Sequence, residues 1–178
     1  MEASSPPREV AVPARGLSEL RRSLREEVGP LASVQALHAA GYAAGEDLYR
    51  GFIQSTADDV QSLGTDRFWR QLSRYFRQKG WGSLRHESPN PAVGLLRSDD
   101  WAEALADTES QPSCAFTSGL LSHFLTLAAG GPIAILEVDC VSRGGECCTF
   151  AFGSEAAIHE LYGHLLEGTS MDEALARV

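Results

Sequence analysis

The sequence contains no long apolar run. None of its segments reaches the about 18 consecutive apolar residues that a membrane-spanning helix requires, so no span is expected. The first 16 residues also lack the apolar core of a secretory signal peptide. From these two absences we expect a cytoplasmic protein, a compartment in which cysteines stay reduced.

Positive charge is scarce as well. The chain has 15 Lys and Arg residues against 24 Asp and Glu, which gives a formal net charge of −9. Binding to a nucleic-acid backbone requires clustered Lys and Arg. A cluster of Arg21, Arg22 and Arg25 does occur, but it lies among glutamates and is interpreted as a solvated helix face. No nucleic-acid partner is expected.

Patterns typical of enzymes are also absent. The sequence has no phosphate-binding loop and no dinucleotide fingerprint, and Ser118 lacks the flanking glycine of a nucleophile elbow. The stretch HELYGH places His164 five residues after His159, whereas the zinc-protease motif requires four. No pair of residues suited to general acid and base catalysis is evident. We therefore expect a protein that is not an enzyme.

What is present fits one folded domain. Apolar residues make up 43% of the 178 residues and charged residues 22%, which is ordinary for a globular protein of this size. Residues 1–16 are rich in Pro, Ser and Ala and show no periodicity, so we predict a disordered tail. Residues 17–178 are predicted to form a single domain.

Apolar periodicity and turn residues predict an α+β fold. Helices are expected at residues 17–28, 31–54, 66–79, 112–129, 155–167 and 171–178, with a short helical turn in WAEALAD. Two hairpins are expected, one turning at residues 89–91 and one formed by residues 133–140 and 147–152. This order favours an antiparallel sheet of two hairpins packed against helices on one face.

Two glycines interrupt the longest predicted helix. Gly41 and Gly45 lie four residues apart on one stripe. Each costs about 1 kcal/mol relative to Ala in a helix, so packing must compensate. This spacing predicts the close approach of another backbone.

Three of the four cysteines lie in EVDCVSRGGECCTF, residues 137–150. If residues 143–145 form a three-residue loop with a left-handed glycine, Cys140 and Cys148 face each other on one side of the sheet. Cys147 then points to the other side. In a reducing compartment such closely spaced cysteines are often metal ligands.

Two further residues can join Cys140 and Cys148. Strict alternation puts Glu137 on the opposite side from Cys140, so the strand must bulge or bend between them for both to serve one site. Cys114 lies near a helix start, where a thiolate is favoured. Three thiolates and a carboxylate would form a closed, structural zinc site. The spacing alone leaves open buried free cysteines or a Cys140–Cys148 disulfide.

A family resemblance rests on the run CAFTSGLLSHFLTLAAGGPIAILEVDCVSRGGECCTFAF. It resembles the 4-vinyl reductase domain family, with its Cys, its Gly-Leu helix, its strand ending Glu-x-x-Cys, its glycine loop and its Cys-x-Phe. Upstream, AAGYAAGEDL is similar to the family's Gly-Tyr-x-x-Gly helix, and WGSLRHESPNPAVGLLRSDDWAEAL is similar to its first hairpin.

The resemblance implies a fold and a ligand set. The fold is that of small-molecule sensor domains related to subunits of the TRAPP trafficking complex, and it is commonly dimeric. Phenol- and xylene-responsive transcription activators carry such sensory modules. Matching positions imply zinc held by Cys114, Glu137, Cys140 and Cys148.

Aromatic residues are the second feature of interest. Phe68, Trp69 and Trp81 belong to a group that crowds one predicted helix and its exit. Core packing is the ordinary explanation. The alternative is the wall of an apolar ligand pocket, to which Arg85 and His86 could add polar groups.

Two functions remain open. The first is a zinc-stabilised domain that binds a small hydrophobic or aromatic molecule and signals through a separate partner, because no ATPase or DNA-binding segment is evident. The alternative is a homodimeric scaffold of the TRAPP-subunit type without a small ligand. The leucine-striped helix at 17–28 could mediate such pairing.

Overall fold

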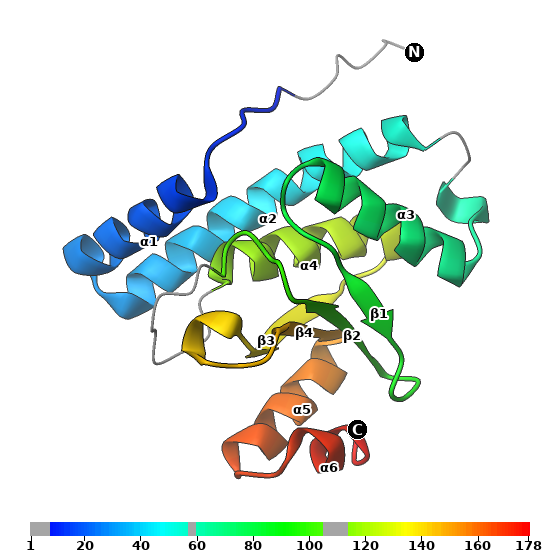
Figure 1. Cartoon of the computed structure of the whole chain (residues 1–178). Coiled ribbons are helices and arrows are strands. Elements are labelled where there is room, and N and C mark those ends of the chain that lie inside the picture. Colours follow the sequence, from blue (N-terminus) through cyan, green and yellow to red (C-terminus); the bar gives the residue numbers. More distant parts are fainter. Residues whose placement is uncertain (1–7, 57–59, 105–113) are drawn as a thin grey trace.

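The computed structural model describes residues 8–56, 60–104 and 114–178 (Figure 1). The helices in these ranges are α1 (Ala14–Val28), α2 (Pro30–Ser55), α3 (Thr65–Gln78), α4 (Ala115–Ala129), α5 (Glu155–Leu166) and α6 (Met171–Leu175). The strands are β1 (Arg85–Glu87), β2 (Val93–Ser98), β3 (Ala134–Asp139) and β4 (Cys148–Gly153). Single 3-10 turns cover Val60–Ser62 and Val141–Arg143.

The predicted α+β class is confirmed. The two hairpins join through their inner strands into one antiparallel sheet of order β1-β2-β4-β3. In the central pair, Leu96 lies opposite Phe150, and Ser98 lies opposite Cys148. The first hairpin turns around Asn90, whose side-chain oxygen accepts the N–H groups of Ala92 and Val93 at 2.8 Å.

Helices cover both faces of the sheet, so the expectation that they lie on one face was wrong. Helices α2, α3 and α4 lie on one side and α5 and α6 on the other (Figure 1). The physical reason is visible along β4, whose apolar residues alternate between two cores. Phe150 and Phe152 pack in the larger core with α2–α4, and Ala151 packs in the smaller core with α5.

The close approach predicted at Gly41 and Gly45 is confirmed, and the partner is α4. A Cβ atom on Gly41 would lie 1.9 Å from the carbonyl oxygen of Phe116, and one on Gly45 would lie 2.7 Å from that of Leu120. A Cβ atom added to Gly119 of α4 would come equally close to the backbone of His38. Helices α2 and α4 therefore touch backbone to backbone, which sets the distance between these two helices.

Some predicted boundaries shift. Helix α1 begins at Ala14, inside the range 1–16 predicted as a tail, because Pro13 has the fixed φ that suits the position before a helix. Residues 1–7 of that tail and Pro112 lie outside the described residues. The described part of WAEALAD, residues 101–104, forms a turn without a helix. No helix in the described ranges is long and apolar enough to cross a membrane.

Replacing Gly41 with Ala should lower the free energy of unfolding by about 1–3 kcal/mol, because the new methyl group must push α2 away from α4. Gly163→Ala is the matched control, since a Cβ atom there meets nothing within 4 Å and its helix propensity should raise stability. Urea unfolding followed by circular dichroism measures both. Equal stability of the two variants would contradict the backbone contact.

Candidate metal centre and apolar cavity

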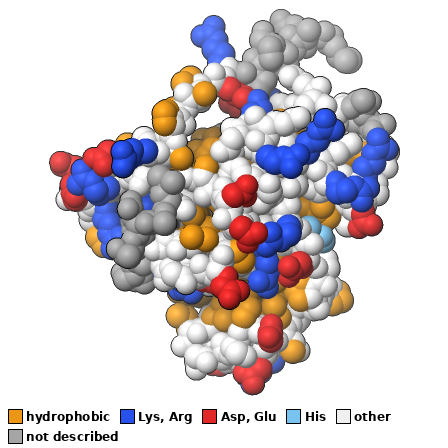
Figure 2. Space-filling view, in the orientation of Figure 1, with side chains coloured by type: hydrophobic (Ala, Val, Ile, Leu, Met, Phe, Trp, Pro, Cys, Tyr) orange, Lys and Arg blue, Asp and Glu red, His pale blue; other side chains and the backbone are white. Residues whose placement is uncertain are grey.

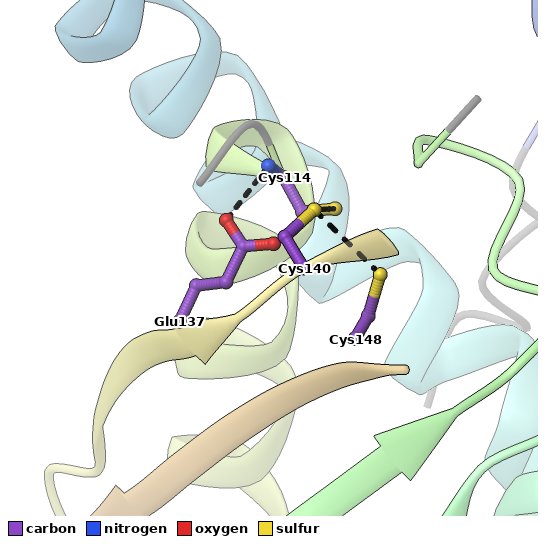
Figure 3. Close-up of side chains that lie close together, drawn as sticks. All are labelled: Cys114, Glu137, Cys140 and Cys148. Atoms are coloured by element: carbon purple, nitrogen blue, oxygen red, sulfur yellow. Dashed lines mark hydrogen bonds between the residues drawn. The ribbon is translucent and has the colours of Figure 1, made fainter. Parts of the chain in front are cut away.

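Four residues from three parts of the chain converge beside the sheet. Cys114 is the N-cap of α4, Glu137 lies in β3, Cys140 follows β3, and Cys148 begins β4. Figure 3 shows their side chains pointing toward one another. The three cysteines are fully buried, and none of the four cysteines, all of which lie within the described residues, forms a disulfide.

The spacing of these groups suits a metal ion. The Sγ atom of Cys140 lies 3.8 Å from the Sγ atoms of both Cys114 and Cys148. Thiolates arranged tetrahedrally about 2.3 Å from a zinc ion are separated by about 3.8 Å. One ligand atom from each of the four residues lies within 4.8 Å of every other, so this set could hold a metal ion.

A strand irregularity brings Glu137 to the same place as Cys140. The register between β3 and β4 shifts between Glu137 and Asp139, which confirms the bulge that the sequence required. The loop after β3 is longer than the predicted three residues, because it includes the 3-10 turn Val141–Arg143. Gly144 then takes the left-handed conformation, with φ of 88°, as predicted for a glycine of this loop.

Only one of the two carboxylate oxygens of Glu137 has a hydrogen-bond partner within the described residues. Its Oε2 atom accepts the backbone N–H of Cys114 at 2.8 Å. Its Oε1 atom is buried and has no hydrogen-bond partner within the described ranges. Burial, followed by the adjacent Cys140 thiol, raises the pKa of Glu137. A cation between the carboxylate and the thiols would satisfy Oε1 and stabilise the charged form.

The thiols of Cys114 and Cys148 also resist ionisation without a cation. The neighbouring thiols of Cys140 and Cys148, then burial and the charge of Glu137, raise the pKa of Cys114. Thiols bind metal as thiolates, so a bound ion would release their protons. Donor type, spacing and the orphaned carboxylate oxygen therefore fit a metal such as zinc.

Cys147 takes no part in this cluster. Its Sγ atom lies 3.5 Å from Oγ1 of Thr149, and the side chain is buried away from the four donors. This agrees with the hairpin geometry, which points adjacent residues to opposite sides.

Glu103 is a second buried carboxylate that the sequence analysis missed. It accepts the backbone N–H groups of Phe116 at 3.0 Å and Thr117 at 2.7 Å, at the start of α4. Burial raises the pKa of Glu103 to about 6. The guanidinium of Arg21 donates to the backbone oxygen of Glu103 at 3.2 Å. No local spacing signals this role, because Glu103 lies well before the helix it caps.

An apolar cavity of about 280 Å³ lies on the same side of the sheet. Phe68 and Trp69 of α3 form one wall, and Leu125 and Ala128 of α4 form another. Phe152 of β4 also lines the cavity. Two of the three aromatic residues singled out in the sequence are thus brought together around one cavity.

The third aromatic residue, Trp81, lies elsewhere. Its ring stacks on that of Phe116, with centroids 5.7 Å apart. The two polar candidates do not line the cavity. The His86 ring stacks on that of Trp69, with ring centroids 4.1 Å apart, and Arg85 pairs with Asp99.

The fold is similar to that of a small-molecule sensory domain and of a trafficking-complex subunit. The phenol-responsive sensory domain of the transcription activator PoxR, solved with phenol, superposes with a TM-score of 0.69 at 14% identity, covering 83% of this chain and 77% of that one. Subunit 3 of the trafficking protein particle complex from Naegleria fowleri, covalently bound to palmitic acid, gives 0.58 at 11% identity, with 79% and 91% covered.

The family resemblance is confirmed in the second half of the chain. Residues 100–154 match the vinyl-4-reductase domain, and they include all four clustered donors. A vinyl-4-reductase family protein from Methanocaldococcus jannaschii has a similar structure, with a TM-score of 0.51, 18% identity and 82% of each chain covered. An uncharacterized protein of the same organism is 28% identical over 79 residues, which are 44% of this chain and 42% of that relative. The match therefore spans less than half of that relative.

Replacing Glu103 with Ala should lower the free energy of unfolding by about 1–3 kcal/mol, because the N–H groups of Phe116 and Thr117 would lose their buried acceptor. Glu160→Ala, at an exposed position of α5, is the control and should change stability little. Thermal unfolding of both variants tests the cap. A melting temperature of Glu103→Ala equal to that of the control would show that Glu103 does not hold α4.

Proposed function

We propose that this chain is a metal-stabilised, non-catalytic domain that binds a small apolar or aromatic molecule and acts on a separate partner protein. The observation that carries the proposal is the apolar cavity between α3 and α4, in a fold similar to a phenol-responsive sensory domain. The charge-poor lining suits a ligand whose binding comes mainly from burial of apolar surface.

The metal in this proposal is zinc, held by Cys114, Glu137, Cys140 and Cys148. Four protein ligands leave no open position, so the ion would supply a cross-link and no reaction chemistry. The ligands would tie the N-terminus of α4 to the β3–β4 hairpin. Since Leu125 and Ala128 of α4 line the cavity, this link would hold one cavity wall in place.

A second candidate function is a dimeric scaffold without a ligand. An exposed apolar surface on the first two helices favours it. Leu20 and Val28 of α1 are 52% and 53% exposed, and Leu31 and Val34 of α2 are 71% and 48% exposed. A second copy of the chain could cover this surface in either function, so a homodimer is part of both proposals.

The purified protein should contain about one zinc ion per chain, as expected for a four-ligand site. Cys140→Ser should lose the metal and several kcal/mol of stability, because metal binding is coupled to folding. Cys147→Ser is the matched control and should keep both. Elemental analysis under reducing conditions, together with thermal unfolding, measures this. A metal-free wild-type protein, or equal zinc in both variants, would refute the site.

Phenol serves as the probe for the cavity. Titration calorimetry should detect its binding to the wild-type protein, and Ala128→Phe should weaken binding by about tenfold or more, because the new ring fills the cavity. Ala156→Phe, at an exposed position of α5, should leave binding unchanged. If the wild-type protein forms a dimer and binds neither phenol nor other small aromatic probes, the result favours the scaffold function over the ligand-binding function.

A further inference from the structure

The solvent face of α3 carries a row of arginines that the sequence analysis did not single out. Arg67, Arg70, Arg74 and Arg77 follow one another at intervals of three, four and three residues, and all four are exposed. On a helix this spacing places them on one side. The row spans eleven residues, from Arg67 to Arg77, and its ends are about 15 Å apart along the helix axis. Figure 2 shows basic side chains gathered over α3.

The charge of this face is opposite in sign to the net charge of the whole chain. Residues 64–85 contain six of the 15 Lys and Arg residues and one acidic residue, Asp66, in a chain of net charge −9. Such a concentration of one sign creates a local potential that attracts anions despite the overall negative charge.

Part of this basic charge is unneutralised. At the edges of the face, Lys79 pairs with Glu9 and Arg85 pairs with Asp99. Within the described ranges, Arg70, Arg74 and Arg77 form no ion pair with any carboxylate. Three neighbouring guanidinium groups on one helix face repel one another, so the free protein holds a charge that a partner could neutralise.

The surface beside these arginines is hollowed. An open depression of about 550 Å³ lies between α3 and β1. Arg70, Arg74 and Arg77 line it from α3, and Arg85 lines it from β1. An anionic group that enters the hollow therefore meets the guanidinium groups of α3 and that of Arg85, which pairs with Asp99, together with a single carboxylate, that of Asp66.

We propose that this arginine face docks an acidic segment of a partner protein. The planar guanidinium binds a carboxylate through two parallel hydrogen bonds, which favours an acidic peptide over a diffuse ion cloud. A short segment also matches the limited length of the row. A nucleic acid or an anionic membrane would extend past it and meet the exposed carboxylates of Glu87 and Asp99.

In the proposed function, this docking surface is the place through which ligand binding affects the partner protein. Helix α3 carries the arginines on one face, while Phe68 and Trp69 of the same helix line the apolar cavity. A ligand that shifts α3 moves the arginines with it. This connection rests on the proposed function, whereas the docking itself does not.

The test uses the whole chain as purified under reducing conditions and a fluorescein-labelled octaglutamate peptide, and binding is followed by fluorescence anisotropy. The wild-type protein should bind the peptide, and rising salt should weaken the complex. The triple variant R70E/R74E/R77E should weaken binding by about tenfold or more. The control R15E/R22E/R177E makes the same change in net charge at exposed sites outside α3 and should change the Kd less than about twofold.

Three outcomes would overturn the proposal. They are no peptide binding by the wild-type protein, equal losses in the two triple variants, and tighter binding of a short DNA duplex or of phosphatidylcholine–phosphatidylserine vesicles than of the peptide. Circular dichroism of each variant confirms folding. Phenol binding is measured on the same samples, so loss of cavity binding with intact peptide docking counts against the proposed function alone.

Discussion

The arrangement of this domain depends on how the N-terminus of α4 is attached to the β3–β4 hairpin. The N–H of Cys114 donates to Glu137, and the thiol of Cys114 lies against that of Cys140. Glu103 accepts the next free N–H groups of the helix. Two buried carboxylates thus meet the positive end of one helix dipole, which is where their charge is best tolerated. A cation among the thiols would complete this attachment.

Once its N-terminus is held, α4 connects the other features of the fold. Its glycine contact with α2 allows no intervening side chain, so the two helices form a single rigid layer. The C-terminal half of α4 leaves a space against α3 and β4, and this space is the apolar cavity. Helix α3 forms one wall of the cavity and presents its arginines to solvent. The cluster of three cysteines and Glu137, the cavity and the arginine face are therefore connected through two helices, α4 and α3.

Local patterns in the sequence predicted much of this. Turn residues and alternation identified both hairpins, and the spacing of Gly41 and Gly45 predicted a backbone contact. The need for a bulge at Glu137 followed from strand geometry alone. Other features had no local signal. Glu103 could not be assigned because its partners follow more than ten residues later. The arginine row was missed because spacing of three and four residues does not appear as a basic run in a linear reading.

The sequence by itself determined the elements of this protein, the candidate metal donors and the family resemblance, because periodicity, turn chemistry and motif spacing are local properties. Only the tertiary structure decided which side chains meet. It brought Cys114 to the hairpin, placed helices on both faces of the sheet, and put Phe68 and Trp69 at a cavity while Trp81 packed elsewhere. The reason is that contacts between distant segments depend on how whole faces pack together, and no short stretch of residues encodes that arrangement.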